Sequence, residues 1–303
     1  MVKLTRRQFA ILPAAAFATA GASASLPARA QPALPQITRP IPSTGEPLPA
    51  VGLGTAAVFD SAGAATLQNA RAVVRALIDN GGKLIDTAST YGDAERILGD
   101  VIGPAGLRDR LFIATKLESA DVEELKRSLN RLQTAKLDLL QLHNVRDPQQ
   151  SLGAFRDWKA QGACRYFGIT STSHGAFAAV AAILAREKPD FVQIDYSIDD
   201  REAEQRILPL AAEVKAGVLT ALPFGRGRLF RAVRDRPLPD WAQVFAASWA
   251  QFFLKYLLGD PRVTAVIPGT ADAAHMTDNL GAMRGPLPDP DQRRRMVQFI
   301  QAL

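Results

Sequence analysis

The chain has 303 residues, of which 47% are hydrophobic, enough to bury one large core. Its formal net charge is +6, but residues 1–30 hold four cations and no acid, so residues 31–303 carry only +2. No basic stripe is interleaved with aromatic residues, and the charge therefore gives no argument for nucleic-acid binding. The single cysteine, Cys164, excludes an internal disulfide and a metal site built from cysteines.

Residues 1–30 have the features of an export signal. Residues 5–9, with their paired arginines and a following phenylalanine, resemble a twin-arginine signal. An apolar run over 10–22 and a small-x-small cleavage site at 28–30 follow. A membrane anchor is the alternative, but the run is shorter than the roughly 20 residues that span a bilayer. We predict export through the twin-arginine machinery, a periplasmic or otherwise exported location, and one mature domain, 31–303, without a membrane span.

The mature chain begins with β-like segments. Residues 37–42 and 46–48 are predicted to form a short N-terminal β-hairpin around the turn at 43–45. Eight short apolar runs then alternate with helix-like segments. The runs are too uniformly apolar to have a solvent-facing side, which is typical of parallel strands covered by helices. The predicted strands are 50–54, 83–87, 111–115, 137–142, 166–170, 191–195, 218–222 and 264–268.

The segments between the strands show helical periodicity. Residues 66–80 end at a Gly81-Gly82 stop, and Asp121 is predicted to cap a helix, with Glu124 completing a capping box. The apolar stripe of that helix consists of Val122, Leu125, Leu129 and Leu132. An aromatic stripe, interpreted as core packing, comprises Trp241, Phe245, Trp249, Phe252 and Phe253. Eight βα units in succession predict an α/β fold of the (β/α)8 TIM barrel type.

A doubly wound parallel sheet is the alternative fold. It would place a glycine-rich phosphate loop after the first strand. The segment Gly52-Leu53-Gly54-Thr55 has the first two glycines of G-x-G-x-x-G, and Ala57 takes the third place, which the fingerprint also accepts. No acid follows at the expected distance, so the barrel is preferred.

Four polar residues follow three successive predicted strands. Asp86 lies at the carboxyl end of the second strand, one residue before its last, and Tyr91 lies five positions later. Lys116 comes just after the third strand and His143 just after the fourth. The carboxyl ends of parallel barrel strands meet at one face, so these side chains are expected to converge. A proton-donating tyrosine needs a nearby cation and an acid to hold that cation, and this set contains both.

With these motifs the chain resembles the aldo/keto reductases over residues 37–283. The family fold is a (β/α)8 barrel. The matching motifs occur in order at predicted strand ends: 52–55, 84–88 with 91–92, 114–116, 138–143, 167–171, 192–193 and 266–269.

The resemblance implies an NADP(H)-linked reductase of an aldehyde or ketone. Tyr91 would be the general acid that protonates the carbonyl oxygen, assisted by Lys116 and Asp86, while His143 would hydrogen-bond and orient the carbonyl. Hydride would come from the nicotinamide. The implied cofactor-binding residues are Thr170, Ser171 and Gln193 for the nicotinamide amide, Gly54 and Thr55 beneath it, Leu222, Phe224, Gly225, Arg226 and Gly227 around the pyrophosphate, and Gly269, Thr270, His275, Asp278 and Asn279 at the adenosine end.

Some positions depart from the family pattern. Where the family commonly has an aromatic residue that stacks on the nicotinamide, this chain has Ala221, and Phe224 is the nearest candidate for an apolar lid. His275 stands where members often carry an arginine for the 2′-phosphate, and Arg226 and Arg228 are candidates to supply that charge. NADP(H) is therefore the expected cofactor and NAD(H) the alternative.

Two other functions fit parts of the pattern. The barrel could bind the cofactor and serve as a sensing or structural subunit with little turnover, or it could be a hydrolase using paired carboxylates such as Asp86 and Asp195. The complete set of four polar residues favours the reductase. With three histidines and no clustered His/Cys/carboxylate set, no metal centre is predicted, and His174 is interpreted as a loop or cap residue.

The export signal gives the first testable prediction. Changing Arg6 and Arg7 together to lysine should leave the precursor in the cytoplasm, because the twin-arginine route depends on that pair. Cell fractionation with immunoblotting measures this, and mass spectrometry of the exported protein should show an N-terminus at Gln31. Lys3→Arg, outside the pair, is the control. Export that survives the double lysine change would contradict the route.

Overall fold

The computed structural model describes residues 34–146 and 148–303. The export signal predicted for residues 1–30 lies outside the described residues. The described chain begins with the predicted hairpin, in which β1 (Thr38–Pro40) pairs antiparallel with β2 (Pro47–Pro49). Gly45 has a φ of 80° in the connecting turn, a conformation that favours glycine.

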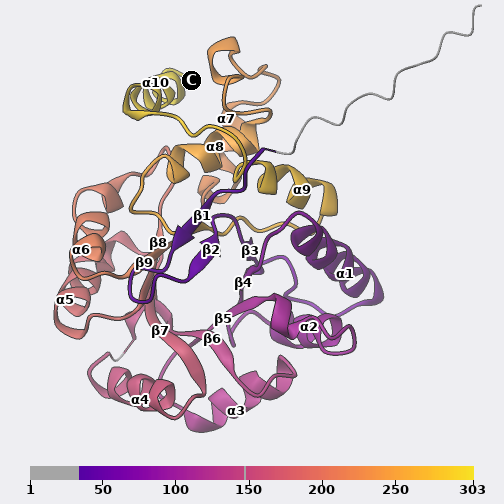
Figure 1. Cartoon of the computed structure of the whole chain (residues 1–303), viewed down its shortest axis with the longest axis vertical. Helices are drawn as coiled ribbons and strands as arrows, with labels where there is room; N and C mark the ends of the chain where they lie inside the picture. The colour runs from indigo at the N-terminus through magenta and orange to yellow at the C-terminus, as the bar shows by residue number, and fades with distance from the viewer. Residues whose placement is uncertain (1–33, 147) are drawn as a thin grey trace, which may run out of the picture. The chain divides into compact units, whose positions relative to one another are not determined.

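The hairpin closes the N-terminal end of a barrel (Figure 1). Its buried residues Ile41 and Leu48 pack against side chains at the amino-terminal ends of the strands, among them Leu84, Phe112 and Phe191. These side chains fill the barrel interior at its N-terminal end. The open, polar end is therefore the opposite one, where the strands have their carboxyl ends.

Eight parallel strands form the barrel, in the same order in space as in the chain. The first and last strands are joined by parallel bridges between Val51 and Val266 and between Gly54 and Gly269. The predicted (β/α)8 barrel with its hairpin is thus confirmed, and a doubly wound sheet is excluded. The strands are β3 (Leu53–Gly54), β4 (Leu84–Asp86), β5 (Phe112–Leu117), β6 (Leu137–Leu142), β7 (Cys164–Ser171), β8 (Phe191–Asp195), β9 (Gly217–Ala221) and β10 (Ala265–Val266).

Helices surround the strands (Figure 1). Each of the first six follows one strand and returns the chain to the start of the next, as the right-handed βα connection requires. The helices are α1 (Ala64–Asp79), α2 (Ala94–Ile102), α3 (Val122–Arg131), α4 (Pro148–Ala160), α5 (Phe177–Glu187), α6 (Ile207–Glu213), α7 (Arg228–Ala232), α8 (Trp249–Leu258), α9 (Ala273–Gly281) and α10 (Pro290–Gln301).

The start of α3 differs in two details from the sequence prediction. Asp121 caps the helix as predicted, accepting hydrogen bonds from the backbone N–H groups of Glu123 and Glu124 at 2.8 and 3.2 Å. The Glu124 carboxylate does not complete a capping box, because it accepts from Arg127 and Arg131 instead. Val122 is 48% exposed, so its place in the apolar stripe was predicted wrongly: it lies between the exposed Asp121 and Glu123 in the first turn of the helix.

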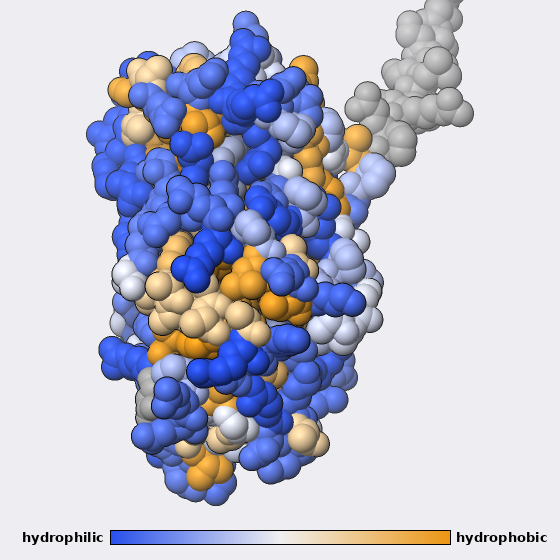
Figure 2. Space-filling model, turned by 90° about the vertical axis from the view of Figure 1, so that its left-hand side faces the viewer, coloured by the Kyte–Doolittle hydropathy of each residue, from blue (hydrophilic) through white to orange (hydrophobic). Residues whose placement is uncertain are grey.

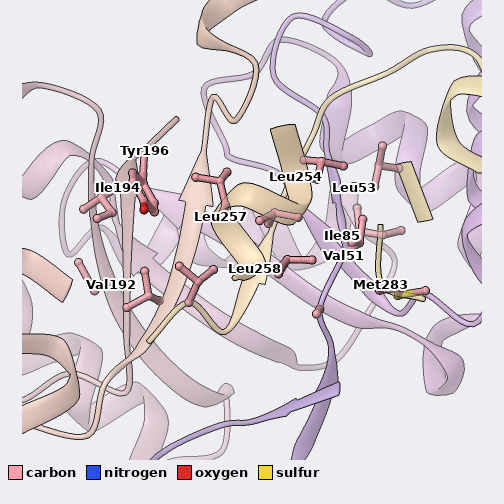
Figure 3. Packing of buried hydrophobic residues seen from close by; sticks show 14 of the residues in the cluster. Val51, Leu53, Ile85, Val192, Ile194, Tyr196, Leu254, Leu257, Leu258 and Met283 are labelled. Carbon is pink, nitrogen blue, oxygen red and sulfur yellow. The ribbon is translucent and has the colours of Figure 1, made fainter. Parts of the chain in front are cut away.

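The larger part of the core lies between the strands and the helices. Figure 3 shows part of it, where Leu257 and Leu258 of α8 belong to one cluster with Val192 and Ile194 of β8. Burial of each such side chain stabilises the fold by about 1.5–3 kcal/mol. The predicted aromatic stripe belongs to this core as well, since Phe252 is fully buried. Its ring packs edge-on against Trp249, with 5.2 Å between the ring centres.

The outer surface is mainly hydrophilic on the side shown in Figure 2, with an apolar patch across its middle. This is the side on which α5 and α6 lie in Figure 1. Three alanines of α5, Ala178, Ala179 and Ala182, are exposed. Among the described residues, no helix is long and apolar enough to cross a membrane.

A close approach of α2 to α3 gives a prediction about stability. A methyl group added at Gly99 would overlap the backbone carbonyl oxygen of Arg131, whereas one added at Gly153 in α4 would meet open space. Gly99→Ala should lower the free energy of unfolding by about 1–3 kcal/mol through overpacking. Gly153→Ala should raise it by about 0.5–1 kcal/mol, because alanine favours the helix. Urea unfolding measures both, and a neutral Gly99→Ala would show that the helices separate freely.

Candidate active site

The four polar residues predicted to converge line one cavity at the carboxyl ends of the strands. The cavity has a volume of about 520 Å³ and receives Asp86 from β4, Lys116 from β5, His143 from just after β6 and Tyr91 from the loop after β4. The convergence follows from the parallel register, which brings successive strand ends to one edge. A cavity of this size suits a small-molecule or cofactor site.

Lys116 and Asp86 form a buried ion pair. The Lys116 ammonium donates to Asp86 Oδ2 at 2.5 Å and to the carbonyl oxygen of Thr87 at 2.7 Å. Their side chains are only 1% and 3% exposed. An unpaired ammonium so far from water would be strongly unfavourable, so each charge requires the other.

Two glutamine side chains complete the surroundings of Asp86. Gln141 donates to Asp86 Oδ1 and Gln193 donates to Oδ2, each at 3.3 Å, and Gln141 also donates to the Gln193 carbonyl oxygen at 2.9 Å. Burial raises the pKa of Asp86, and the lysine and the two amides partly offset that rise. Gln141 was not a predicted site residue, although its place one residue before the end of β6 gave a signal that could have been used.

Tyr91 lies directly beside this pair. The Lys116 ammonium is 5.0 Å from the centre of the Tyr91 ring. The His143 ring packs edge-on against the Tyr91 ring, with 5.8 Å between the ring centres. The predicted acid, cation, phenol and imidazole therefore form one contiguous group. Such a group can place a proton donor next to a fixed positive charge.

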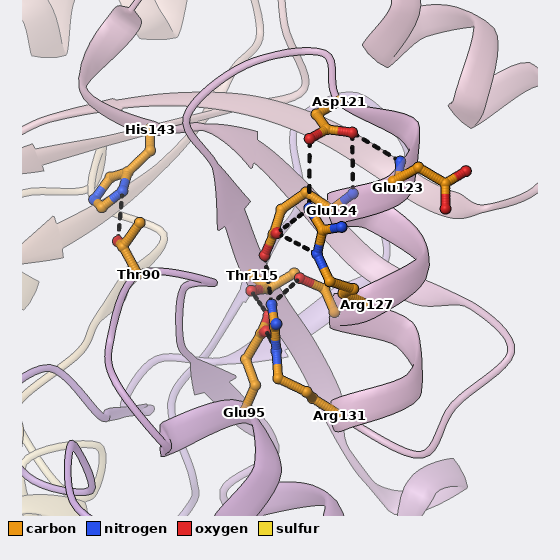
Figure 4. Close-up of polar contacts among 10 residues, drawn as sticks. Thr90, Glu95, Thr115, Asp121, Glu123, Glu124, Arg127, Arg131 and His143 are labelled. Carbon is orange, nitrogen blue, oxygen red and sulfur yellow. Dashed lines mark hydrogen bonds and ion pairs between the residues drawn. The ribbon is translucent and has the colours of Figure 1, made fainter.

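His143 is neutral in this setting. Its pKa is lowered to about 4, first by burial and then by the charges of Lys116 and Arg146. Its Nδ1 atom lies 3.4 Å from the Thr90 hydroxyl (Figure 4) and 3.3 Å from a carboxylate oxygen of Glu118. The imidazole can therefore form hydrogen bonds in the cavity without adding charge at neutral pH.

A second buried carboxylate supports β5 from outside the barrel (Figure 4). Glu95 is 1% exposed, accepts from the Thr115 hydroxyl at 2.6 Å, and pairs with Arg131 at 2.8 Å. Thr115 precedes Lys116, so α2, α3 and β5 are tied together at the level of the candidate site.

The structure divides the residues predicted for the cofactor into two groups. One group lines the cavity: Gly54, Thr170, Gln193, Leu222, Phe224, Arg226, Gly227 and Gly269. The other does not: Thr55, Ser171, Gly225, Thr270, His275, Asp278 and Asn279. Within the second group, Thr55 is buried against the Asp86 carbonyl oxygen, His275 is exposed near the start of α9, and Asp278 accepts from Gln251 at 2.7 Å. Their roles toward a cofactor stay predictions.

The loop after β9 has an unusual backbone. Leu222, Gly225, Arg226 and Gly227 all have φ between 53° and 80°. Successive residues of this kind form concave arrays of backbone groups that suit anions. The following Arg228 is held by Asp199 at 3.0 Å, while Arg226 lines the cavity. Arg226 is thus the better placed of the two arginines proposed to supply charge.

Several cavity residues were not found by sequence reasoning. Ala56, Ala57, Val58, Asn144, Thr172, Pro223 and Ile267 also line it. Ala57 and Asn144 have φ of 55°, a strained conformation for residues other than glycine that concentrates at functional sites. Ala221 also faces the cavity, and Phe224 beside it packs on Phe230 at 4.8 Å.

The statement that no His/Cys/carboxylate cluster exists was wrong. His174, at the start of a short 3₁₀ turn, lies with Asp195 and Asp200 so that one ligand atom from each falls within 4.8 Å of the others. Its Nε2 contacts Asp200 at 2.9 Å and its Nδ1 contacts Glu202 at 3.0 Å. Burial, and then the charge of the neighbouring Asp200, raise the pKa of Asp195 to about 6. The cluster is formed by the ends of the consecutive strands β7 and β8 and the loops that follow them.

Comparison with known proteins identifies the family. The sequence model of the aldo/keto reductase family matches residues 50–296. The chain belongs to the aldo/keto reductase family. It is accordingly an NAD(P)H-dependent oxidoreductase, from a family whose members reduce carbonyl groups.

Individual relatives agree with this assignment. Aldo-keto reductase YhdN of Bacillus subtilis is 31% identical over 209 residues, which span 61% of this chain and 60% of that protein. Methylglyoxal reductase YeaE of Escherichia coli is 27% identical over 248 residues, or 78% of this chain and 86% of that protein. The crystal structure of an aldo-keto reductase from Klebsiella pneumoniae in complex with NADPH has a TM-score of 0.75 at 26% identity, covering 88% of this chain and 96% of that one.

The lowered pKa of His143 predicts a pH-dependent stability. Between its ordinary pKa of 6.5 and about 4, the unfolded chain binds a proton that the folded chain does not, so the fold loses stability as the pH falls through this window. Between pH 7.5 and pH 5.0 the free energy of unfolding of the native reductase should fall by about 2 kcal/mol more than that of His143→Gln. Urea unfolding at both pH values measures the difference, with the exposed His275→Gln as control. Equal losses in all three proteins would contradict the shift.

Proposed function

We propose that this aldo/keto reductase transfers hydride between a nicotinamide cofactor, with NADPH favoured, and a small aldehyde or ketone, with Tyr91 as the general acid. The observation that carries the proposal is the buried Lys116–Asp86 pair beneath the Tyr91 ring, at the wall of the cavity. A fixed cation next to a phenol stabilises the phenolate that remains after proton donation. Neutral His143 supplies a hydrogen bond that positions the substrate.

The cavity fits a nicotinamide cofactor. Bound there, the cofactor would supply the hydride. Thr170 and Gln193 line the part of the cavity next to Asp86, where they would face the nicotinamide amide, and the positive-φ loop from Leu222 to Gly227 would lie along the pyrophosphate. At Gly54 an added methyl group would come within 2.8 Å of the Ile267 carbonyl oxygen, so glycine here allows the close backbone approach that closes the barrel at this wall of the cavity.

Cofactor preference rests on few positive charges. Arg226 lines the cavity, and the described residues offer it no ion-pair partner, which leaves it available to a phosphate. His275 is exposed at the start of α9, and it would bind a 2′-phosphate more weakly than an arginine there. We therefore propose NADPH as the preferred cofactor, with weaker discrimination against NADH than an arginine at position 275 would give.

We also propose that the enzyme is exported already folded, with its cofactor bound. The sequence of residues 5–9 supports the twin-arginine route, which carries folded cargo. A charged nucleotide is not expected to be abundant outside the cytoplasm, so a chain that folds around it first would bring its own supply. Nucleotide released on denaturing the exported protein would support this, and nucleotide-free protein would refute it.

Tyr91→Phe tests the catalytic proposal. Loss of the general acid should lower kcat for reduction by about 10²–10⁴-fold, while NADPH affinity stays within a few fold, because the hydroxyl acts on the substrate. NADPH absorbance measures turnover on a panel of aldehydes and ketones, and fluorescence titration measures binding. Tyr166→Phe is the matched control, since that hydroxyl contacts Glu46 and Thr44 at the closed end of the barrel. A fully active Tyr91→Phe would overturn the mechanism, and a native protein that binds NADPH but reduces nothing would favour the sensing subunit.

A further inference from the structure

The His174 cluster lies outside the cavity and takes no part in the proposed reaction. His174 belongs to the short turn after β7, Asp195 ends β8, and Asp200 and Glu202 lie in the segment that follows β8. One ligand atom from each of the first three residues lies within 4.8 Å of the other two. None of these residues lines the cavity that contains Tyr91, so the cluster is a separate feature of the molecule.

We propose that His174, Asp195 and Asp200 bind a zinc ion, and that Glu202 is a positioning residue that orients the histidine toward it. His174 would supply Nε2 and each aspartate one carboxylate oxygen. A zinc ion with three protein ligands usually keeps water in its remaining position. Water can reach this one, because the His174 side chain is 39% exposed. The site stands on its own geometry and does not depend on carbonyl reduction.

The His174 ring already has the surroundings of a metal ligand. Metal-binding histidines usually donate the N–H of one ring nitrogen to a carboxylate and bind the metal through the other. His174 Nδ1 lies 3.0 Å from a Glu202 carboxylate oxygen, while Nε2 faces Asp200 Oδ2 at 2.9 Å. The ring also packs on Phe177, with 5.1 Å between the ring centres. With its proton on Nδ1, the imidazole directs the lone pair of Nε2 toward the aspartates.

A cation is required between these groups. The lone pair of Nε2 and the Asp200 carboxylate would repel each other at 2.9 Å unless a proton or a metal ion lies between them. Asp195 adds a second negative charge, and within the described part of the chain it receives no hydrogen bond and forms no ion pair. A proton on His174 would balance one carboxylate, whereas a divalent ion would balance both.

The backbone brings the aspartates together, and the imidazole selects the ion. Ser197 and Asp200 exchange two backbone hydrogen bonds at 3.1 Å, which returns the chain to the end of β8 beside Asp195. Ligand atoms around tetrahedral zinc lie about 3.3 Å apart, so only a small side-chain rotation is needed from the present separations. Carboxylates alone would suit Ca²⁺ or Mg²⁺, but an imidazole nitrogen beside them favours zinc.

Zinc at this position would also affect the loop after β9. It would join the turn after β7 to the turn that contains Asp199, which holds Arg228 at 3.0 Å. Arg228 follows directly on the positive-φ loop from Leu222 to Gly227. Zinc is therefore expected to tighten NADPH binding. This consequence, unlike the zinc site itself, rests on the proposed function.

Isothermal titration of the untagged full chain with zinc chloride tests the site. The native protein should bind one zinc ion per chain and should not bind magnesium from magnesium chloride. His174→Ala and Asp195→Asn should each abolish zinc binding, while Glu202→Gln should weaken it about tenfold, the usual effect of losing the carboxylate behind a histidine ligand. His275→Ala and Glu123→Gln, at an exposed histidine and at an exposed acid paired with Lys126, are the matched controls and should bind zinc normally.

Cobalt(II) in place of zinc reports the ligands directly. The visible absorption of tetrahedral cobalt should appear in the native protein and be missing in His174→Ala, with circular dichroism confirming that the variant is folded. Absence of zinc binding, or binding that survives both His174→Ala and Asp195→Asn, would overturn the proposal and leave the cluster as ion pairs of a protonated histidine.

Fluorescence titration with NADPH tests the consequence for the cofactor. Zinc chloride should lower the Kd for NADPH at least about fivefold in the native protein, the lower end of typical coupling between two sites, and should have no effect in His174→Ala. An unchanged Kd would overturn the coupling. A protein that binds zinc but no NADPH would instead refute the proposed function, and the zinc site would stand.

Discussion

A lysine ammonium inside a barrel is the constraint on which the candidate site depends. Lys116 is 1% exposed, and removing such a charge from water is unfavourable unless a partner and further hydrogen bonds compensate. Asp86 supplies the opposite charge, the Thr87 carbonyl supplies an acceptor, and Gln141 and Gln193 satisfy the remaining carboxylate lone pairs. Removing either charge would leave the other unpaired in the interior, so the strand ends that carry these residues are held at one level.

The sheet provides room for this network by leaving out a side chain. Gln141 on β6 reaches Gln193 on β8, although β7 lies between them in the sheet. The β7 residue paired with Gln141 is Gly168, where an added methyl group would come within 3.2 Å of the Gln141 side chain. A larger residue there would push the amide away from Asp86. Below this layer the interior is apolar, from Leu84 and Phe112 down to the hairpin, so water has no path to the ion pair from the closed end.

The sequence predicted the repeated strands and the polar residues at their carboxyl ends. Uniformly apolar runs located all eight strands, and two of them, β6 and β8, have the predicted bounds. The four polar residues converge as predicted because parallel strands permit no other arrangement of their ends. Contacts between side chains distant in sequence left no periodic pattern to detect. For that reason the bonds of Gln141, the contact of Glu118 with His143 and the His174 cluster were all missed. The Glu124 side chain was misassigned for a local reason, because Arg127 and Arg131 on the same helix compete with the helix cap for its carboxylate.

The same lysine also determines the character of His143. After burial itself, the charge of Lys116 is the largest influence that lowers the pKa of the imidazole, and Arg146 adds to it. A protonated His143 would be a second cation near Lys116, while Asp86 already pairs with the lysine. The fold therefore selects the neutral ring, and a neutral ring offers a ligand one hydrogen bond whose direction depends on its tautomer. The buried ion pair thus fixes the charge state of the site.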